Sequence, residues 1–317
     1  MSTIFTLSIL QSALELGCIY SLVALALFIS FSILNIADLS TDGCFTLGCA
    51  VGAMVTLAGH PWLALFAAMG AGLCSGFITA FLQTRMGVPS ILAGIIVNTG
   101  LYTINIAVMG FSSNVNLFAC DTIFSLAKEK LSFSWYDAWY KFLILLLIVA
   151  VLGLFLAWFL NTRLGLSIRA TGDNEHMVLA SSINPLLMIT VGLCLANALT
   201  ALSGAILGQY QKSCDINLGT GMVTIALASL IIGETIIGSG SILKKVIGVV
   251  LGSCLYRFIV ALALRLNVPA EALKLVSAII VAFAISFPYL KEKFRLYRMR
   301  SMNPNAHRKA GADNAGH

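Results

Sequence analysis

Apolar stretches separated by short polar segments follow one another along most of the chain. About nine of them have the ~20 residues that an α-helix needs to cross the hydrocarbon core of a bilayer. They cover residues 7–31, 40–58, 61–82, 89–110, 141–160, 185–208, 221–239, 244–265 and 271–289. The pattern predicts an all-α integral membrane protein, a polytopic bundle of about nine transmembrane helices.

A polar segment near residues 35–45 interrupts this pattern between the first and second apolar stretches. It contains two carboxylates, Asp38 and Asp42, together with Ser40, Thr41 and a glycine. Backbone that leaves a helix at membrane depth is tolerated only where protein or a water-filled cavity satisfies its polar groups. The segment therefore predicts a broken helix beside a transport path.

The four-residue spacing of Asp38 and Asp42 would place both carboxylates on one face of a helix, where like charges repel. That repulsion favours an open break, or a site that attracts a cation or an ammonium group. Alternatively, Asp38, Ser40 or Asp42 caps the N-terminus of the second apolar helix. The sequence allows both.

A second segment resembles the first, because Asp215 follows the sixth apolar stretch and precedes glycines and small residues. With the predicted spans, the first and sixth stretches cross the membrane in opposite directions. Broken helices in such inverted repeats meet near the midplane of many transporters. The alternative is that Asp and Gly mark two ordinary loops.

Other polar side chains lie inside apolar stretches. Asparagines there usually form hydrogen bonds between helices, and lining of a path is the second interpretation. A carboxylate such as Glu234 costs about 2.5–3.5 kcal/mol at the bilayer centre, so it should face a cavity or a partner, and Arg257 is one candidate partner. The candidates for the path are Asp38, Ser40, Thr41, Asp42, Asn98, Asn105, Asn197, Asp215 and Glu234.

Composition supports the membrane class, because 59% of the residues are hydrophobic and only 10% are charged. Soluble domains carry about 25% charged residues. Residues 1–290 are expected to form one transmembrane domain, followed by a basic tail over 291–317. A basic segment beside a membrane span marks the cytoplasmic side rather than nucleic-acid binding, which predicts a multi-pass cell-membrane protein with its N-terminus outside.

The sequence shows no arrangement of residues that is typical of a catalytic site. The histidines and cysteines lack metal-ligand spacing, and no nucleophile stands with a base. The segment 238–245 contains two glycines before Lys244 and Lys245 but lacks the ending of a phosphate-binding loop. The sequence thus predicts no enzyme, no metal and no nucleotide site on this chain.

The polar loop at about 161–184 has a different character. Asp173 can cap a short helix with Glu175 in its first turn, and Met177 begins an apolar face. Arg163 and Arg169 supply charge. A short amphipathic helix at the cytoplasmic surface fits a groove on another protein.

Several motifs resemble those of permeases of ATP-binding-cassette (ABC) importers, in the branch that includes branched-chain amino acid and ribose permeases. The closest resemblance is to the aromatic amino acid, tryptophan-type subgroup, and it extends over about residues 10–290. The motifs are Gly17-Cys-Ile-Tyr-Ser-Leu-Val-Ala-Leu, Asp38-Leu-Ser-Thr-Asp-Gly-Cys-Phe-Thr-Leu-Gly, Arg169-Ala-Thr-Gly-Asp-Asn with Gly165 and Ile183-Asn184, and Ile231-Ile-Gly-Glu.

This resemblance implies a core of two permeases, most simply a homodimer. Two cytoplasmic ATPase subunits would bind ATP and magnesium, and an external solute-binding protein or lipoprotein would deliver the solute. The implied coupling residues are Arg163, Gly165, Arg169, Ala170, Gly172, Asp173, Asn174, Glu175 and Met177. The competing function is a secondary transporter that couples ions through Asp38, Asp42 or Glu234.

Overall fold

The computed structural model describes residues 7–130, 139–238 and 240–265, with a few isolated residues beyond. Within these ranges six helices are long and apolar enough to cross a membrane. The spanning helices are α1 (Leu7–Leu27) with its π-helical continuation η1 (Phe28–Ile33), α3 (Pro61–Thr84), α4 (Ser90–Val108), α6 (Tyr140–Phe159), α9 (Pro185–Gln211) and α11 (Ile242–Arg265).

Two apolar helices of the described part are shorter, α2 (Thr41–Leu57) and α10 (Met222–Ile237). Each follows one of the two polar segments that the sequence singles out. The helical membrane fold is therefore confirmed. The count of about nine spans is not, since the expected span at 271–289 lies outside the described residues and two of the others are short.

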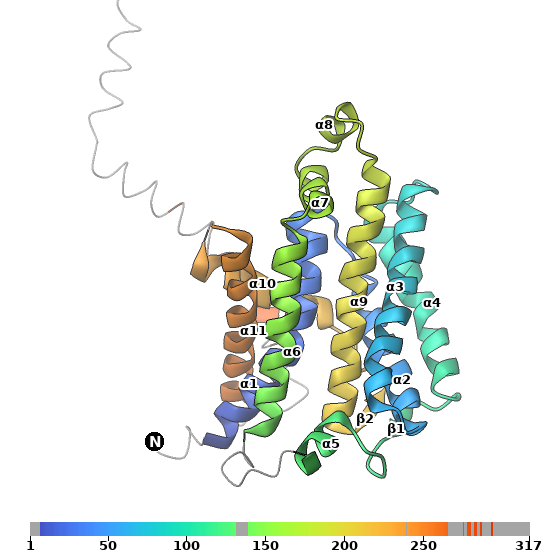
Figure 1. Ribbon diagram of the computed structural model, residues 1–317, viewed down its shortest axis with the longest axis vertical. Coiled ribbons are helices and arrows are strands. Elements are labelled where there is room, and N and C mark those ends of the chain that lie inside the picture. Colours follow the sequence, from blue (N-terminus) through green and yellow to red (C-terminus); the bar gives the residue numbers. More distant parts are fainter. Residues whose placement is uncertain are drawn as a thin grey trace, which may run out of the picture.

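Small elements close the two ends of the bundle (Figure 1). At one end lie α7 (Arg163–Asp173) and α8 (Glu175–Ala180); at the other lie α5 (Ile123–Lys130), β1 (Asn114–Asn116) and β2 (Ser213–Asp215). The two strands pair antiparallel with Val115 opposite Cys214, a two-stranded sheet that the all-α prediction lacks.

The first helix of each half of the chain packs against helices of the other half. Helix α1 packs against α10 and α11 of the second half, and α9 packs against α2 and α3 of the first half. Figure 1 shows α1 rising from the end that carries β1 and β2, whereas α9 descends from α8. This reciprocal packing agrees with the inverted repeat that the two similar segments predict.

Glycines allow helices α2 and α9 to approach each other closely. Gly48 of α2 lies against the backbone of Ala201, and Gly204 of α9 lies against the backbone oxygen of Phe45, so that a side chain at either position would collide. Small residues at such crossings let two helix backbones come into van der Waals contact. Helices α2 and α9 therefore pack with their backbones in direct contact.

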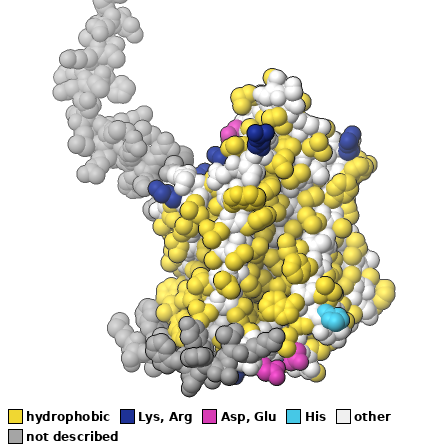
Figure 2. All heavy atoms as spheres, in the orientation of Figure 1, with side chains coloured by type: hydrophobic (Ala, Val, Ile, Leu, Met, Phe, Trp, Pro, Cys, Tyr) yellow, Lys and Arg dark blue, Asp and Glu magenta, His cyan; other side chains and the backbone are white. Residues whose placement is uncertain are grey.

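The outer surface is apolar over the length of the helices (Figure 2). Large side chains such as Phe66 of α3, Leu147 of α6 and Trp158 of α6 are more than half exposed. On a water-facing surface such exposure would be costly, and in a bilayer it is expected. The face in Figure 2 carries most of its Lys and Arg side chains at the end with α7 and α8.

Candidate functional site

The short helices α2 and α10 meet at their N-terminal ends. The Asp42 carboxylate, in the first turn of α2, accepts hydrogen bonds from the backbone N–H groups of Gly221 at 3.0 Å and Val223 at 2.9 Å. These groups belong to the start of α10, whose dipole favours a negative charge there. Asp42 therefore caps the partner half-helix rather than its own.

The loop before α10 lies directly on α2. Thr46 Oγ1 accepts a hydrogen bond from the Gly219 N–H at 3.1 Å. A Cβ atom at Gly219 would collide with the Asp42 backbone oxygen and approach the Thr46 hydroxyl. Gly221 has a φ of 86°, a left-handed conformation that favours glycine. These two glycines allow the loop to reach the Asp42 side chain.

Asp38 has a structural environment. Its side chain is 2% exposed. Oδ1 accepts from the Ser40 N–H at 2.8 Å and from the Ser40 hydroxyl at 2.6 Å, and Oδ2 accepts from Asn197 Nδ2 at 2.9 Å. The Thr41 hydroxyl donates to the Asp38 backbone oxygen at 3.1 Å. Asp38 thus fastens the break in the chain to α9.

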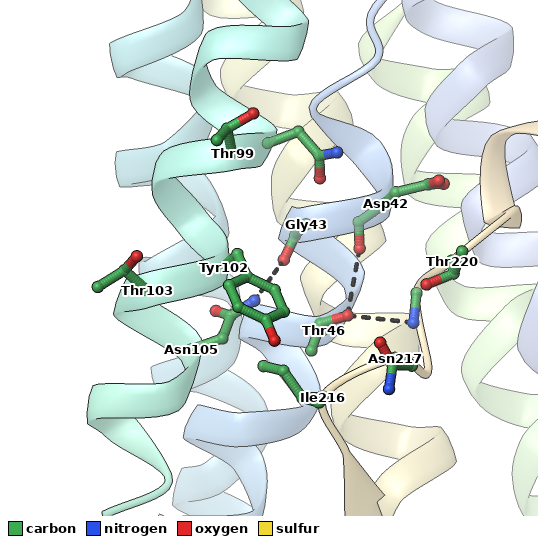
Figure 3. A pocket seen from close by; sticks show the side chains of 12 residues that line it. Asp42, Gly43, Thr46, Thr99, Tyr102, Thr103, Asn105, Ile216, Asn217 and Thr220 are labelled. Carbon is green, nitrogen blue, oxygen red and sulfur yellow. Dashed lines mark hydrogen bonds between the residues drawn. The ribbon is translucent and has the colours of Figure 1, made fainter. Parts of the chain in front are cut away.

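A polar cavity of about 400 Å³ opens beside Asp42 (Figure 3). Helix α2, helix α4 and the loop 216–220 line it, so both halves of the chain contribute. Three of the predicted path residues, Asp42, Asn98 and Asn105, are among its lining. Further polar residues that line it were not among the predicted path residues: Thr46, Thr99, Tyr102, Thr103, Asn217 and Thr220.

Asn105 is a deeply buried polar residue of this cavity. Its side chain is 1% exposed, and Nδ2 donates to the Gly43 backbone oxygen at 3.1 Å. Oδ1 is buried and has no hydrogen-bond partner. An unsatisfied buried polar group costs about 1–3 kcal/mol, and in native proteins it calls for an explanation.

The other predicted path residues lie elsewhere. Asn197 binds Asp38, as described above. Asp215 belongs to β2, where its Oδ1 accepts from the Asn217 N–H at 2.8 Å. Glu234, near the C-terminal end of α10, accepts from the Ser32 hydroxyl at 2.6 Å, whereas the Arg257 guanidinium stacks 3.6 Å from the centre of the Tyr20 ring. The suggested pair of Glu234 and Arg257 is therefore wrong.

The segment between α6 and α9 forms two short helices, where the sequence suggests one. Thr162 caps α7 by accepting from the Gly165 N–H at 3.3 Å. Asn174 caps α8 by accepting from the Met177 N–H at 3.1 Å. Asp173 ends α7, so the prediction that it caps the following helix is wrong by one residue. The Asp173 side chain is exposed and caps neither α7 nor α8.

The predicted coupling residues differ in exposure. Gly165 is buried against the end of α6, and Arg169, Ala170 and Gly172 are partly buried. The remaining ones are exposed: Arg163, Asp173, Asn174, Glu175 and Met177. Helices α7 and α8 project from one end of the bundle (Figure 1). The segment therefore presents a surface while its glycines hold it to the membrane-spanning helices.

Comparison with known proteins gives the family. Residues 9–285 match the family model of the permease component of branched-chain amino acid transport systems. The chain belongs to this family. It is 31% identical to a tyrosine transport system permease protein of Clostridioides difficile over 85% of this chain and 88% of the relative. No solved structure gives a significant match.

More distant relatives share the same class of transporter. The chain is 28% identical to a guanosine ABC transporter permease of Bacillus subtilis, over 72% of this chain and 65% of that protein. It is 27% identical to the ribose import permease of Escherichia coli, over 90% and 80% of the two chains. The family and the apolar helices establish a multi-pass membrane permease of the ABC transporter class.

Proposed function

We propose that this chain is the membrane-spanning subunit of an ATP-driven importer for an amino acid, with aromatic amino acids as the first candidates. It would sit in the cell membrane, receive its solute from an external solute-binding protein and pair with cytoplasmic ATPase subunits. The observation that carries the proposal is the polar cavity beside the meeting point of α2 and α10, at Asp42. Broken helices that meet inside a bundle are typical of transport sites.

The exposed face of α4 supports a second copy of the chain as partner. Thr99, Tyr102 and Thr103 are exposed on this helix and line the cavity. Polar side chains in a spanning helix rarely face lipid. A second permease packed against this side would enclose the cavity between the two copies and separate it from the bilayer.

Helices α7 and α8 supply a surface for the ATPase. Leu164, Leu166, Met177 and Leu179 are each at least half exposed at the end of the bundle. An apolar patch on a surface helix fits a groove on a partner protein. The face around these residues is the proposed docking site, and residues 291–317 would form a basic tail on the same side.

The basic tail supports the orientation with α7 and α8 in the cytoplasm, because residues 291–317 carry seven of the 19 Lys and Arg residues and would lie on this side. Among the described residues the two ends are equally basic: Arg85, Arg163, Arg169, Lys244 and Lys245 lie on this side, and Lys128, Lys130, Lys141, Lys212 and Arg265 lie on the other. Cytoplasmic loops carry an excess of Lys and Arg. On this orientation the N-terminus and the small β1–β2 sheet lie outside, where the solute-binding protein would dock.

The substrate class rests on the relatives. The tyrosine permease of C. difficile favours an amino acid, and guanosine and ribose are the substrates named for two more distant relatives. The experiment is reconstitution of the permease in proteoliposomes with its ATPase and binding protein, followed by uptake of labelled tyrosine and tryptophan. We expect uptake only with hydrolysable ATP inside the vesicles.

A secondary transporter would behave differently in that experiment. Uptake that persists without the ATPase, driven by a proton or sodium gradient, would contradict the proposal. Of the three carboxylates that such a mechanism could use, Asp38 and Asp42 already accept two or more hydrogen bonds and Glu234 accepts one from Ser32. These contacts favour structural roles for the acidic side chains.

A further inference from the structure

We infer that Tyr102 of α4 receives the aromatic side chain of the transported solute in the cavity beside Asp42, and that Asn98 binds a polar group of the same solute. The inference rests on the proposed function and adds to it the side chain that the permease recognises. Tyr102 is the one aromatic residue among the described residues that line this cavity.

The Tyr102 ring is available to a ligand. Its side chain is 51% exposed, and it forms neither a hydrogen bond nor a ring contact within the part of the chain that the structure describes. Figure 3 shows this side chain leaving α4 toward the pocket, on the side where Thr46 and Ile216 lie. Stacked or edge-to-face contact with such a ring favours an aromatic ligand over an aliphatic one.

The rest of the lining suits an uncharged group. Asp42 is the one charged side chain among the described residues around the cavity, and backbone N–H groups of Gly221 and Val223 already bind its two oxygens. The other polar side chains of the lining are neutral hydroxyls and amides. An aromatic side chain carries no charge, so it can enter the cavity without competing for the bonds of Asp42.

The Asn98 amide lies beside the ring. Asn98 stands one helical turn before Tyr102, so both side chains lie on the same face of α4. The amide is partly buried and forms no hydrogen bond with the described residues. Its Oδ1 would be 2.6 Å from a Cβ atom added at Gly43, which places it against the start of α2. An amide without a partner inside a membrane is unfavourable, so a polar group of the solute is a suitable partner.

The cavity has room for one solute that contacts both side chains. Its volume of about 400 Å³ falls in the range of small-molecule sites, about 300–1,000 Å³. The Cβ atoms of residues one helical turn apart are separated by about 5–6 Å. An amino acid can therefore place its aromatic ring on Tyr102 and the amine or carboxylate that all amino acids share at Asn98.

The test compares amino acids that differ only in the side chain. Phenylalanine, tryptophan and leucine have the same charged ends. Their binding to the permease–ATPase complex in lipid nanodiscs is measured by calorimetry and saturation-transfer NMR, without the solute-binding protein, so that any preference belongs to the permease. We expect phenylalanine and tryptophan to bind about two- to tenfold more tightly than leucine, the value of one aromatic pair.

Variants of Tyr102 assign this preference to its ring. Tyr102→Leu should abolish the preference, and Tyr102→Phe, which keeps the ring, should retain it. Thr99→Val is the matched control, because Thr99 lines the cavity but its hydroxyl already donates to the Ile95 backbone oxygen at 2.8 Å. The preference should stay unchanged in this control.

A variant of Asn98 tests the second contact. Asn98→Leu should weaken the binding of all three amino acids by the same factor, about two- to tenfold for a neutral hydrogen bond, and leave their ratios unchanged. Unchanged affinities in a folded Asn98→Leu complex would contradict the assignment of the amide. Tyr102→Leu replaces an exposed side chain, so it tests the ring even if Asn98→Leu does not assemble.

Three results would overturn the inference: equal binding of phenylalanine and leucine, no saturable binding of phenylalanine at millimolar concentration, or an unchanged preference in Tyr102→Leu. The oligomeric mass of Tyr102→Leu should equal that of the wild type. Loss of a permease copy from this variant would assign the exposed ring to the contact between copies instead.

Uptake measured on the same preparation tests the proposed function separately. ATP-driven uptake by a complex that fails the binding tests would remove only the aromatic site. Absence of ATP-driven uptake of any amino acid would remove the proposed function, whatever the binding measurements show.

Discussion

The side-chain amide of Asn35 donates a hydrogen bond to the backbone oxygen of Gly172 at 2.9 Å. Asn35 follows η1 in a left-handed conformation with φ of 55°, and Gly172 lies in the last turn of α7. The Gly172 backbone also lies against the backbone oxygen of Ile33. The surface helix α7 and the break in the first spanning helix are therefore joined by one side-chain hydrogen bond and one backbone contact, and we expect a displacement of α7 to move that break.

Gly172→Ala tests this contact. The added methyl group would collide with the Ile33 backbone oxygen, so α7 would have to shift away from η1. We expect ATP-driven uptake to fall by about threefold to thirtyfold, the range of mutations that alter coupling between sites. ATP hydrolysis by the assembled complex should continue. The measurement is the ratio of solute imported to ATP hydrolysed in proteoliposomes.

Gly70→Ala is the control for this substitution. Gly70 lies in the spanning helix α3, and a methyl group there would meet no other atom within 4 Å. The same chemical change should leave the ratio at the wild-type value. Equal ratios in Gly172→Ala and wild type would show that the contact between α7 and η1 carries no coupling.

Asp42→Asn tests the cap on α10. Asparagine keeps the size of the side chain but faces one of the two backbone N–H groups, of Gly221 or Val223, with its own amide protons. We expect the free energy of unfolding to fall by about 1.5–3 kcal/mol, the value of hydrogen bonds to a charged group. Denaturant titration in detergent measures it.

Asp215→Asn is the matched control for the cap. Asp215 accepts a local bond from the Asn217 N–H in a turn that asparagine forms equally well. Its unfolding free energy should therefore remain within about 0.5 kcal/mol of wild type. A similar loss of stability in both variants would mean that charge alone, and not the cap on α10, accounts for the effect.

Asp38→Ala should be the most damaging of the acidic substitutions. It leaves the Ser40 N–H without an acceptor in a site that is 2% exposed. The Ser40 hydroxyl and the Asn197 amide lose their shortest bonds and keep only longer ones, to Asn197 Oδ1 at 3.4 Å and to the Leu193 backbone oxygen at 3.2 Å. We expect a loss of about 2–5 kcal/mol, seen as reduced thermal stability in detergent. Asp38→Asn retains one acceptor oxygen and should lose less than half as much. Equal stability of both variants and wild type would contradict a structural role.

The sequence predicts the parts of this fold that follow from local patterns. The long apolar helices and the break near Asp38 and Asp42 are where apolar periodicity and a polar interruption place them. The relation between the halves is also visible, because the two polar segments precede the two short helices. The two-stranded sheet was missed, since three residues per strand carry no periodic signal.

The contacts that the sequence does not predict are those between residues far apart along the chain. Asp42 caps a helix through N–H groups that lie 179 and 181 residues away along the chain, and no local motif contains that information. Thr46 is the exception: it stands one helical turn after Asp42, so helical spacing alone would place it on the same wall of the cavity. Tyr102 and Asn217 have no such signal.

Glu234→Gln separates the proposed importer from an ion-coupled transporter. Glu234 accepts one hydrogen bond, from the Ser32 hydroxyl at 2.6 Å, and glutamine offers the same acceptor without a charge. We expect ATP-driven uptake to remain within about twofold of wild type, because loss of charge assistance at one partly exposed bond costs only a few tenths of a kcal/mol. Glu234→Leu removes the acceptor and controls for packing. If the carboxylate binds a coupling ion, Glu234→Gln should instead abolish uptake while leaving solute binding unchanged, and initial uptake rates at saturating solute decide between the two.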